Sequence, residues 1–176
     1  MVEAFALFDT AIGRCSVAWR GERLCGIWLP SPDDTATRAA ILRRHPGAHE
    51  EAPSALAREA IEGIARLLDG VPEDLSTIAL DMTALAPFER QVYEVARTIA
   101  AGHTLTYGEI ARALGSPGSA RAVGRALGRN PFPIVVPCHR VLAAGGRSGG
   151  FSAPGGVATK LRLLAIERGD DLFAGL

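Results

Sequence analysis

The sequence predicts an α+β protein with two domains, a small N-terminal α/β domain over residues 1–84 and a mainly helical C-terminal domain over residues 85–176. Two observations support this expectation. Short apolar stretches separated by turn residues fill the first 30 residues, which is typical of strands. After residue 84, apolar residues recur at helical spacing in one segment after another. At 176 residues the chain is long enough to bury two modest hydrophobic cores.

The N-terminal part is expected to hold a small sheet covered by helices. Strands are predicted over residues 4–9, 14–19 and 24–29, and Pro30 and Pro32 end this run. Helical spacing of alanine, leucine and isoleucine predicts helices over residues 36–42 and 56–68. Residues 75–80 are expected to add a further strand.

The C-terminal part is expected to consist mainly of helices. Proline at position 87 predicts a helix start, and the apolar spacing continues until Gly102. Thr106 and Glu109 form a capping-box signature for a second helix, which ends at Gly115. A tight turn then leads to a helix over residues 119–129, so this pair predicts a helix-turn-helix. A last helix is expected over residues 157–168.

Charge is distributed unevenly, although the formal net charge is zero. No Asp or Glu lies between Glu109 and Glu167, whereas this stretch holds Arg112, Arg121, Arg125, Arg129, Arg140, Arg147, Lys160 and Arg162. A local excess of basic residues is expected of a protein that binds a polyanion. The alternative is a set of arginines on a solvated face.

The remaining composition favours a cytoplasmic protein. The first residues do not resemble a secretion signal, and no apolar stretch approaches the roughly 18 residues that would span a membrane. The three cysteines show no disulfide-framework spacing, which fits a reducing compartment.

The helix over residues 119–129 has an unusual surface. Arg121, Arg125 and Arg129 recur every four residues, with no acid to offset their repulsion. Two interior glycines each cost about 1 kcal/mol relative to alanine, and the small residues leave a thin, smooth face. Val123 and Leu127 are expected to face the core. A thin cationic helix suits the DNA minor groove, which is about 6 Å wide; the alternative is a tightly packed core helix with solvated arginines.

An apolar run ends in Pro137-Cys138-His139-Arg140, which places a potential nucleophile beside a potential base. Residues 132–137 are expected to be extended and buried, and Asn130, freed by the following proline, can use its side chain. Adjacent residues on an extended chain point in opposite directions, so a Cys138–His139 contact needs a bridging water or a local turn. Glu167 is the candidate to orient the imidazole. The alternative is a buried structural cysteine.

These motifs together resemble the O6-alkylguanine-DNA alkyltransferase family. The resemblance lies in Pro137-Cys138-His139-Arg140-Val141, in Asn130-Pro131 and in the Ala120–Gly124 helix, and it covers about Phe88 to Glu167. The first 80 or so residues match only in length and plan. The resemblance implies a ribonuclease H-like sheet in the N-terminal domain and a winged-helix-like C-terminal domain. It also implies a monomer that binds duplex DNA and needs no cofactor.

The activity implied is irreversible, single-turnover transfer of an alkyl group, such as methyl, from O6-alkylguanine to a cysteine, with O4-alkylthymine left open as a second substrate. Cys138 would be the acceptor, activated through a water by His139, with Glu167 orienting His139 and Asn130 bracing the site. Tyr107 would help to rotate the phosphate of the target nucleotide and would donate a proton to the departing guanine. Extruding the base costs a few kcal/mol.

The resemblance also implies a DNA-binding surface and a substrate pocket. Arg121 would be the finger that replaces the extruded nucleotide. The remaining DNA-binding residues would be Ala120, Ala122, Gly124, Arg125, Arg129 and Tyr107, and the pocket would be formed by Pro133, Val141, Phe151 and Ser152, with Ser152 bonding near O6.

Two departures from the family pattern bear on substrate choice. Phe151 stands where the family usually has tyrosine, and the loop over residues 151–156 is longer by two residues, which leaves the accepted alkyl size open. A catalytically dead relative replaces the acceptor cysteine, whereas Cys138 is present here.

Two other classes of function remain as alternatives. One is a non-catalytic helix-turn-helix protein that binds DNA or senses alkylation; the other is a cysteine hydrolase that uses Cys138 and His139 and needs no DNA. A metal site is not expected. Cys15 and Cys25 could face one another across a hairpin, with His45 and His49 downstream, but this spacing matches no compact zinc pattern.

Overall fold

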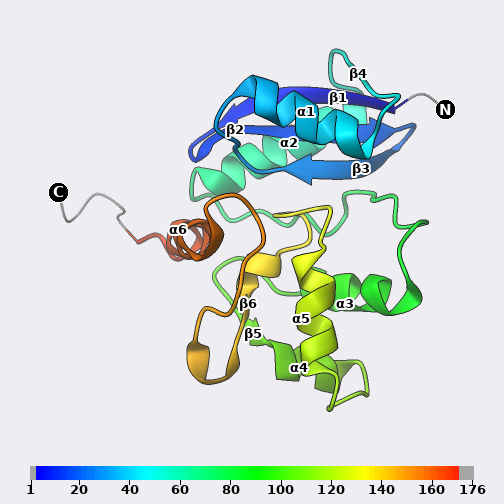
Figure 1. The fold of residues 1–176 in the computed structure, drawn as a ribbon. Helices are drawn as coiled ribbons and strands as arrows, with labels where there is room; N and C mark the ends of the chain where they lie inside the picture. The colour runs from blue at the N-terminus through cyan, green and yellow to red at the C-terminus, as the bar shows by residue number, and fades with distance from the viewer. Residues whose placement is uncertain (1–2, 171–176) are drawn as a thin grey trace.

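The computed structural model describes residues 3–170, and Figure 1 shows a sheet with a helix on each face, next to a second group of helices. The sheet has the strand order β3-β2-β1-β4. Its strands are β1 (Glu3–Thr10), β2 (Gly13–Arg20), β3 (Arg23–Trp28) and β4 (His49–Glu50). The first three strands pair antiparallel, and β4 pairs parallel to β1. The three predicted N-terminal strands are thus confirmed, whereas β4 was not expected.

Strand alternation explains why helices cover both faces of the sheet. Ala4, Ala6 and Phe8 belong to the main core, whereas Phe5 of the same strand belongs to a smaller cluster on the other face. Helix α1 (Asp34–Arg44) covers the smaller cluster through Ile41. Helix α2 (Ala55–Leu68) packs against the main core. Both helices begin at a side-chain cap, Asp33 for α1 and Ser54 for α2.

Residues 75–80 do not form the strand that the sequence predicts. Only one bridge joins this segment to the sheet, between Leu80 and Leu24 of β3. The guanidinium of Arg97 binds three carbonyl groups of this segment. Its Nη2 donates to the Leu75 carbonyl at 3.4 Å, to the Ser76 carbonyl at 2.5 Å and to the Ile78 carbonyl at 2.7 Å. A side chain distant in sequence therefore satisfies the backbone groups that a strand partner would otherwise bond.

The second part of the chain contains the predicted helices. They are α3 (Pro87–Arg97), α4 (Tyr107–Ala113), α5 (Ala120–Gly128) and α6 (Gly156–Arg168), with short 3-10 turns η1 (Cys138–Arg140) and η2 (Ala144–Gly146) and the short parallel strands β5 (Leu105–Thr106) and β6 (Val141–Leu142). The capping box is confirmed, because the Glu109 amide donates to Thr106 Oγ1 at 3.1 Å and the Thr106 amide donates to Glu109 Oε2 at 2.6 Å. Helices α4 and α5, joined by a turn, pack against one another.

One continuous hydrophobic core joins the two parts of the chain. It includes Leu24 and Ile64 from the first part and Val123, Phe132 and Val136 from the second. The backbone amide of Ile27 in β3 also donates to the Pro131 carbonyl at 2.9 Å, directly after α5. The segment that leads to Cys138 is thereby held by the shared core and by the hydrogen bond to β3.

That segment is buried as predicted, but it is not extended. The Val136 amide donates to the Phe132 carbonyl at 2.8 Å, and Ile134 adopts a left-handed backbone conformation with φ of 74°. Such a conformation is unfavourable for a β-branched residue, by about 1–3 kcal/mol, and persists where surrounding packing imposes it. The chain reverses here, and Cys138 begins the turn η1. The local turn that a Cys138–His139 arrangement requires is therefore present.

No helix among residues 3–170 is long and apolar enough to cross a membrane.

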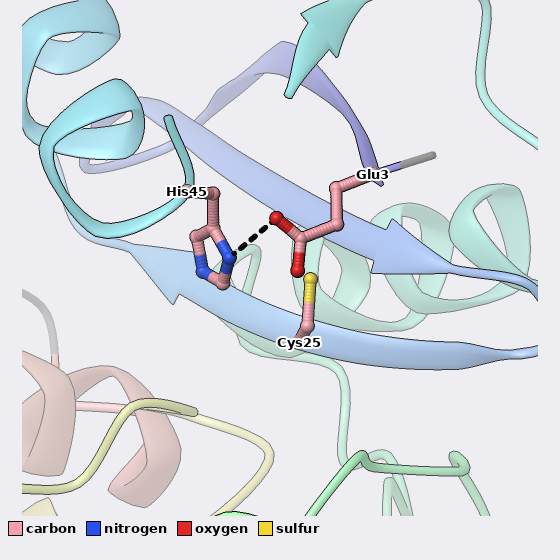
Figure 2. A group of neighbouring side chains, drawn as sticks. All are labelled: Glu3, Cys25 and His45. Carbon is pink, nitrogen blue, oxygen red and sulfur yellow. Dashed lines mark hydrogen bonds and ion pairs between the residues drawn. The ribbon is translucent and has the colours of Figure 1, made fainter. Parts of the chain in front are cut away.

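A separate cluster of polar side chains joins β1, β3 and the residue that directly follows α1. Figure 2 shows Glu3, Cys25 and His45, whose nearest ligand atoms lie within 4.8 Å of one another, and His45 Nδ1 is 3.0 Å from Glu3 Oε2. Glu3 also pairs with Arg20. Burial raises the pKa of the Cys25 thiol to about 11, so the thiol is protonated at neutral pH. Arg20 provides the opposite charge for the Glu3 carboxylate, so Glu3 and Arg20 form an ion pair beside His45 and the Cys25 thiol.

The two N-terminal cysteines do not face one another. Cys15 lies in the main core, whereas Cys25 lies in the smaller cluster on the opposite face of the sheet. His49 is exposed and pairs with Glu51 at 2.8 Å.

Candidate active site

A large open cavity of about 1600 Å³ lies between the two parts of the chain. Its walls come from α1, the end of β3, α4, α5, the segment after α5 and the loop that follows β6. Cys138 is partly exposed and forms part of this wall, whereas Cys15 and Cys25 are buried elsewhere. Among the three cysteines, Cys138 is therefore the one that a molecule in the cavity can reach.

Behind Cys138, a buried chain of polar contacts leads to Glu167. His139 Nε2 donates to Glu167 Oε1 at 2.6 Å, and both side chains are almost fully buried. With Nε2 as the donor, Nδ1 is the ring nitrogen that can accept a proton, and among the described residues it has no hydrogen-bond partner. The predicted pairing of Glu167 with His139 is present, 28 residues apart in sequence.

Glu167 has further partners that the sequence did not indicate. Arg140 donates to it through Nε at 2.9 Å and Nη2 at 2.8 Å, and Arg140 Nη1 donates to the Ile99 carbonyl at 2.6 Å. The Gly102 amide donates to Glu167 Oε2 at 3.2 Å. The carboxylate therefore joins α6, the turn η1 and the turn after α3.

Burial and hydrogen bonding set the pKa values of Glu167 and His139. Burial alone would raise the pKa of Glu167, but the hydrogen bonds from His139 and Arg140 lower it to about 2. Burial lowers the pKa of His139 against the opposing effect of Glu167, so the imidazole is neutral at pH 7 and can act as a base.

The pKa of the Cys138 thiol is raised, whereas the pKa values of Glu167 and His139 are lowered. Burial raises its pKa, while hydrogen bonding by Asn130 and the positive charge of Lys160 act in the other direction. The resting side chain is therefore a thiol, and it needs a base such as His139 to become a nucleophile.

Asn130 fixes the turn that precedes the cysteine. Its Nδ2 donates to the Val136 carbonyl at 2.8 Å, and its Oδ1 accepts from the Phe132 amide at 2.9 Å. The side chain spans the base of the reversed segment and thereby sets the position of Cys138.

Tyr107 lies at the start of α4 and is half-buried at the cavity wall, where burial raises the pKa of its hydroxyl. Gly149 closely approaches its ring, since a Cβ at Gly149 would lie 2.8 Å from the Tyr107 hydroxyl. The backbone of Gly149 is also left-handed, with φ of 68°, so glycine suits this position on both counts.

Lys160 is a site residue for which the sequence analysis proposed no role. It is almost fully buried on α6, and its Nζ donates to the Val141 carbonyl at 2.6 Å and to the Gly150 carbonyl at 3.4 Å. Nζ also lies 5.9 Å from the centre of the Tyr107 ring. The available signal was its helical spacing with the buried Leu163 and Leu164, which places a lysine on the core-facing side of the helix.

The structure brings most of the predicted site residues to one cavity. Its lining includes Cys138, Asn130, Tyr107, Ala120, Arg121, Gly124, Arg125, Arg129, Pro133, Phe151 and Ser152. Ala122 and Val141 do not line it, although both were expected to bind DNA or substrate. Val141 is fully buried, and its carbonyl group is held by Lys160. His139 and Glu167 lie behind the wall.

The basic stretch divides into surface and internal charges. Arg140 and Lys160 are buried and therefore do not contribute to a surface patch in the expected way. Arg129 has an acidic partner, Glu89 of α3 at 3.5 Å, which lies far away in sequence. The expectation that no acid offsets Arg121, Arg125 and Arg129 is thus wrong for Arg129, which directly follows α5. Arg121 and Arg125 are exposed at the cavity.

Comparison with known proteins points to one family. Residues 87–169 match the family model described as 6-O-methylguanine DNA methyltransferase, DNA binding domain. A methylated-DNA--protein-cysteine methyltransferase from Methanothermobacter thermautotrophicus is 40% identical over 68% of this chain and 65% of its own length. One from Mycolicibacterium paratuberculosis is 50% identical over 52% of this chain and 53% of its own length. The chain thus matches between about half and two thirds of the length of these curated relatives.

The structural similarity extends over nearly the whole chain. The crystal structure of Mycobacterium tuberculosis OGT in complex with DNA is 31% identical, covers 95% of this chain and 94% of its own, and has a TM-score of 0.77. Sequence motif, site geometry and both kinds of similarity agree, and the chain belongs to the O6-alkylguanine-DNA alkyltransferase family.

Proposed function

We propose that this protein repairs alkylated duplex DNA by transferring the alkyl group from O6-alkylguanine irreversibly to Cys138. The observation that supports this most directly is a reachable thiol, backed by a buried His139–Glu167 pair, in a cavity beside the arginines of α5. A nucleophile, a base and a group that orients the base are the parts that nucleophilic catalysis requires.

The proton moves first. The thiol proton of Cys138 passes through a water to the free Nδ1 of His139, while Glu167 holds the other ring nitrogen and favours the charged imidazole. Asn130 and Lys160 stabilise the thiolate that results.

The transfer step then exchanges one bond for another. The sulfur electron pair forms the S–C bond as the C–O6 bond breaks, and the electrons of that bond remain on the guanine. Tyr107 donates a proton to the departing base and recovers one from solvent, where His139 releases its own. Ser152 donates a hydrogen bond near O6. The step uses only the thiol, the lesion, these side chains and water, so it needs no cofactor.

The product explains why the protein acts once. A thioether has no leaving group of its own and no route back to the thiol in this site, so one protein molecule is consumed for each lesion. The ratio of transferred alkyl groups to protein therefore ends at one.

DNA binding is assigned to α5 and its neighbours. Arg121, exposed near the start of α5, is the finger that fills the place of the extruded nucleotide. The small residues Ala120 and Gly124 let the helix approach the minor groove closely.

The finer organisation is also part of the proposal. We assign residues 1–84 to a ribonuclease H-like domain and residues 85–176 to a winged-helix-like domain. The protein acts in the cytoplasm, which fits its three unpaired cysteines.

The test is intact mass spectrometry after mixing the protein with an equimolar duplex that carries one O6-methylguanine, followed by peptide mapping. One added methyl on Cys138, saturating at one per protein, is the expected result. Cys138→Ala should bind the same duplex without gaining mass. Tight DNA binding without a mass change in the wild-type protein would favour a binding-only protein, and repeated turnover without DNA would favour a hydrolase.

A further inference from the structure

The cavity that holds Cys138 continues past α5 to a second wall in the first part of the chain. This wall consists of the end of β3 and one side of α1, and it includes Trp28, Ser31, Ala36, Ala40, Arg43 and Arg44. None of these residues takes part in the proposed chemistry. Their place in the same cavity calls for a separate explanation.

The charged residues around the cavity are almost all positive. They are Arg43, Arg44, Arg112, Arg121, Arg125 and Arg129, together with one acid, Glu109. The Glu109 carboxylate accepts a hydrogen bond from the Thr106 amide in the capping box, so its charge lies at the start of α4. A cavity with arginines on two of its walls concentrates anions.

Arg43 and Arg44 stand in the last turn of α1 and are both exposed. Among residues 3–170, neither side chain has an ion-pair partner, whereas Arg38 of the same helix pairs with Glu50 at 2.7 Å. The helix dipole favours basic residues at this end by about 0.3–1 kcal/mol. The dipole does not explain why both side chains face the cavity that α5 lines.

The arginines of α1 and those at α5 line the same cavity and together form one basic track. Arg121 and Arg129 are eight residues apart, which corresponds to about 12 Å along the helix. The chain leaves α5 and contacts β3 at once through the Ile27–Pro131 hydrogen bond, so the Arg129 end of α5 adjoins the first part of the chain. Arg43 and Arg44 line the same cavity, so they extend this row of arginines onto the first part of the chain.

We infer that Arg43 and Arg44 bind phosphates of the same duplex that α5 engages, so that the N-terminal half is part of the DNA-binding surface. This inference rests on the proposed function, because it takes duplex DNA as the ligand of α5. DNA phosphates fit these residues because they attract arginine irrespective of base sequence and occur at regular intervals.

The test compares three double variants. R43A/R44A removes the two charges, R43K/R44K keeps them with a different side chain, and R58A/R168A removes two exposed arginines outside the cavity. Arg168 stands in the last turn of α6, as Arg43 and Arg44 stand in the last turn of α1, so the control also removes a charge that complements a helix dipole. Binding of an unmodified duplex is followed by fluorescence anisotropy over a series of salt concentrations.

Each phosphate contact contributes about 0.9 to the slope of log K against log salt concentration. R43A/R44A should therefore lose between about one and two units of slope and bind at least several-fold more weakly in low salt. R43K/R44K should keep most of the slope, and R58A/R168A should match the wild-type protein. Thermal unfolding of each variant checks that the fold is intact.

The outcomes separate this inference from the proposed function. If R43A/R44A keeps the slope and affinity of a wild-type protein that binds duplex DNA, α1 does not contact DNA and the inference is wrong. If the wild-type protein does not bind duplex DNA, the proposed function fails and the inference with it.

Discussion

Replacing Glu167 by glutamine should destabilise the protein far more than the loss of one surface charge. In the structure the carboxylate accepts hydrogen bonds from His139, Arg140 and the Gly102 amide, and its side chain is about 2% exposed. Glutamine has a similar size but carries no charge, and its amide group would face donors. The Arg140 guanidinium, itself about 7% exposed, would remain buried without a counter-ion.

Leaving one member of a buried ion pair without its partner costs about 3–5 kcal/mol. We therefore expect the free energy of unfolding of Glu167→Gln to fall by about 3–5 kcal/mol, measured by urea denaturation with a constant m-value. Glu62→Gln, at an exposed position on α2, is the matched control and should change stability by less than about 0.5 kcal/mol. A loss below about 1 kcal/mol in Glu167→Gln would mean that Arg140 is readily hydrated, which would refute the reasoning.

Two further predictions concern pH. Lys160→Met should shift the rate of alkyl transfer from a free O6-alkylguanine base to higher pH, because the positive charge of Lys160 favours the Cys138 thiolate; an unchanged pH profile would leave Lys160 a purely structural role. Acid should destabilise the wild-type protein in two stages: His139 has a lowered pKa, so stability falls below pH 6.5, where the unfolded chain binds a proton first. Glu167, with its pKa of about 2 against 4.5 in the unfolded chain, contributes stability above pH 4.5 that is lost as the pH falls toward 2; urea titrations from pH 7 to pH 3 that gave a constant stability would contradict both assignments.

Local signals in the sequence predicted the elements that depend on neighbouring residues. The β1–β3 strands follow from apolar stretches between turns, and α4 follows from the Thr106–Glu109 capping box. The pairing of His139 with Glu167 was predicted because Glu167 is the first acid after a long interval without any. The family resemblance was confirmed by the comparisons.

Features that depend on distant partners could not be predicted in the same way. The sequence of residues 75–80 predicts a strand, but Arg97 on a later helix binds carbonyl groups of this segment. The prolines around Ile134 favour extended geometry, but core packing imposes a reversal there. Lys160 and the wall formed by α1 belong to the site only because tertiary folding brings them there.

The Glu167 carboxylate also limits how this protein can change over generations. It holds the imidazole of His139, pairs with Arg140 and binds the turn at Gly102, so one side chain serves both the proposed chemistry and the fold. A substitution of Glu167 that would alter the basicity of His139 would first unfold the protein, so selection would remove it. A library that varies this position would therefore lose most of its members to unfolding before their chemistry could be measured.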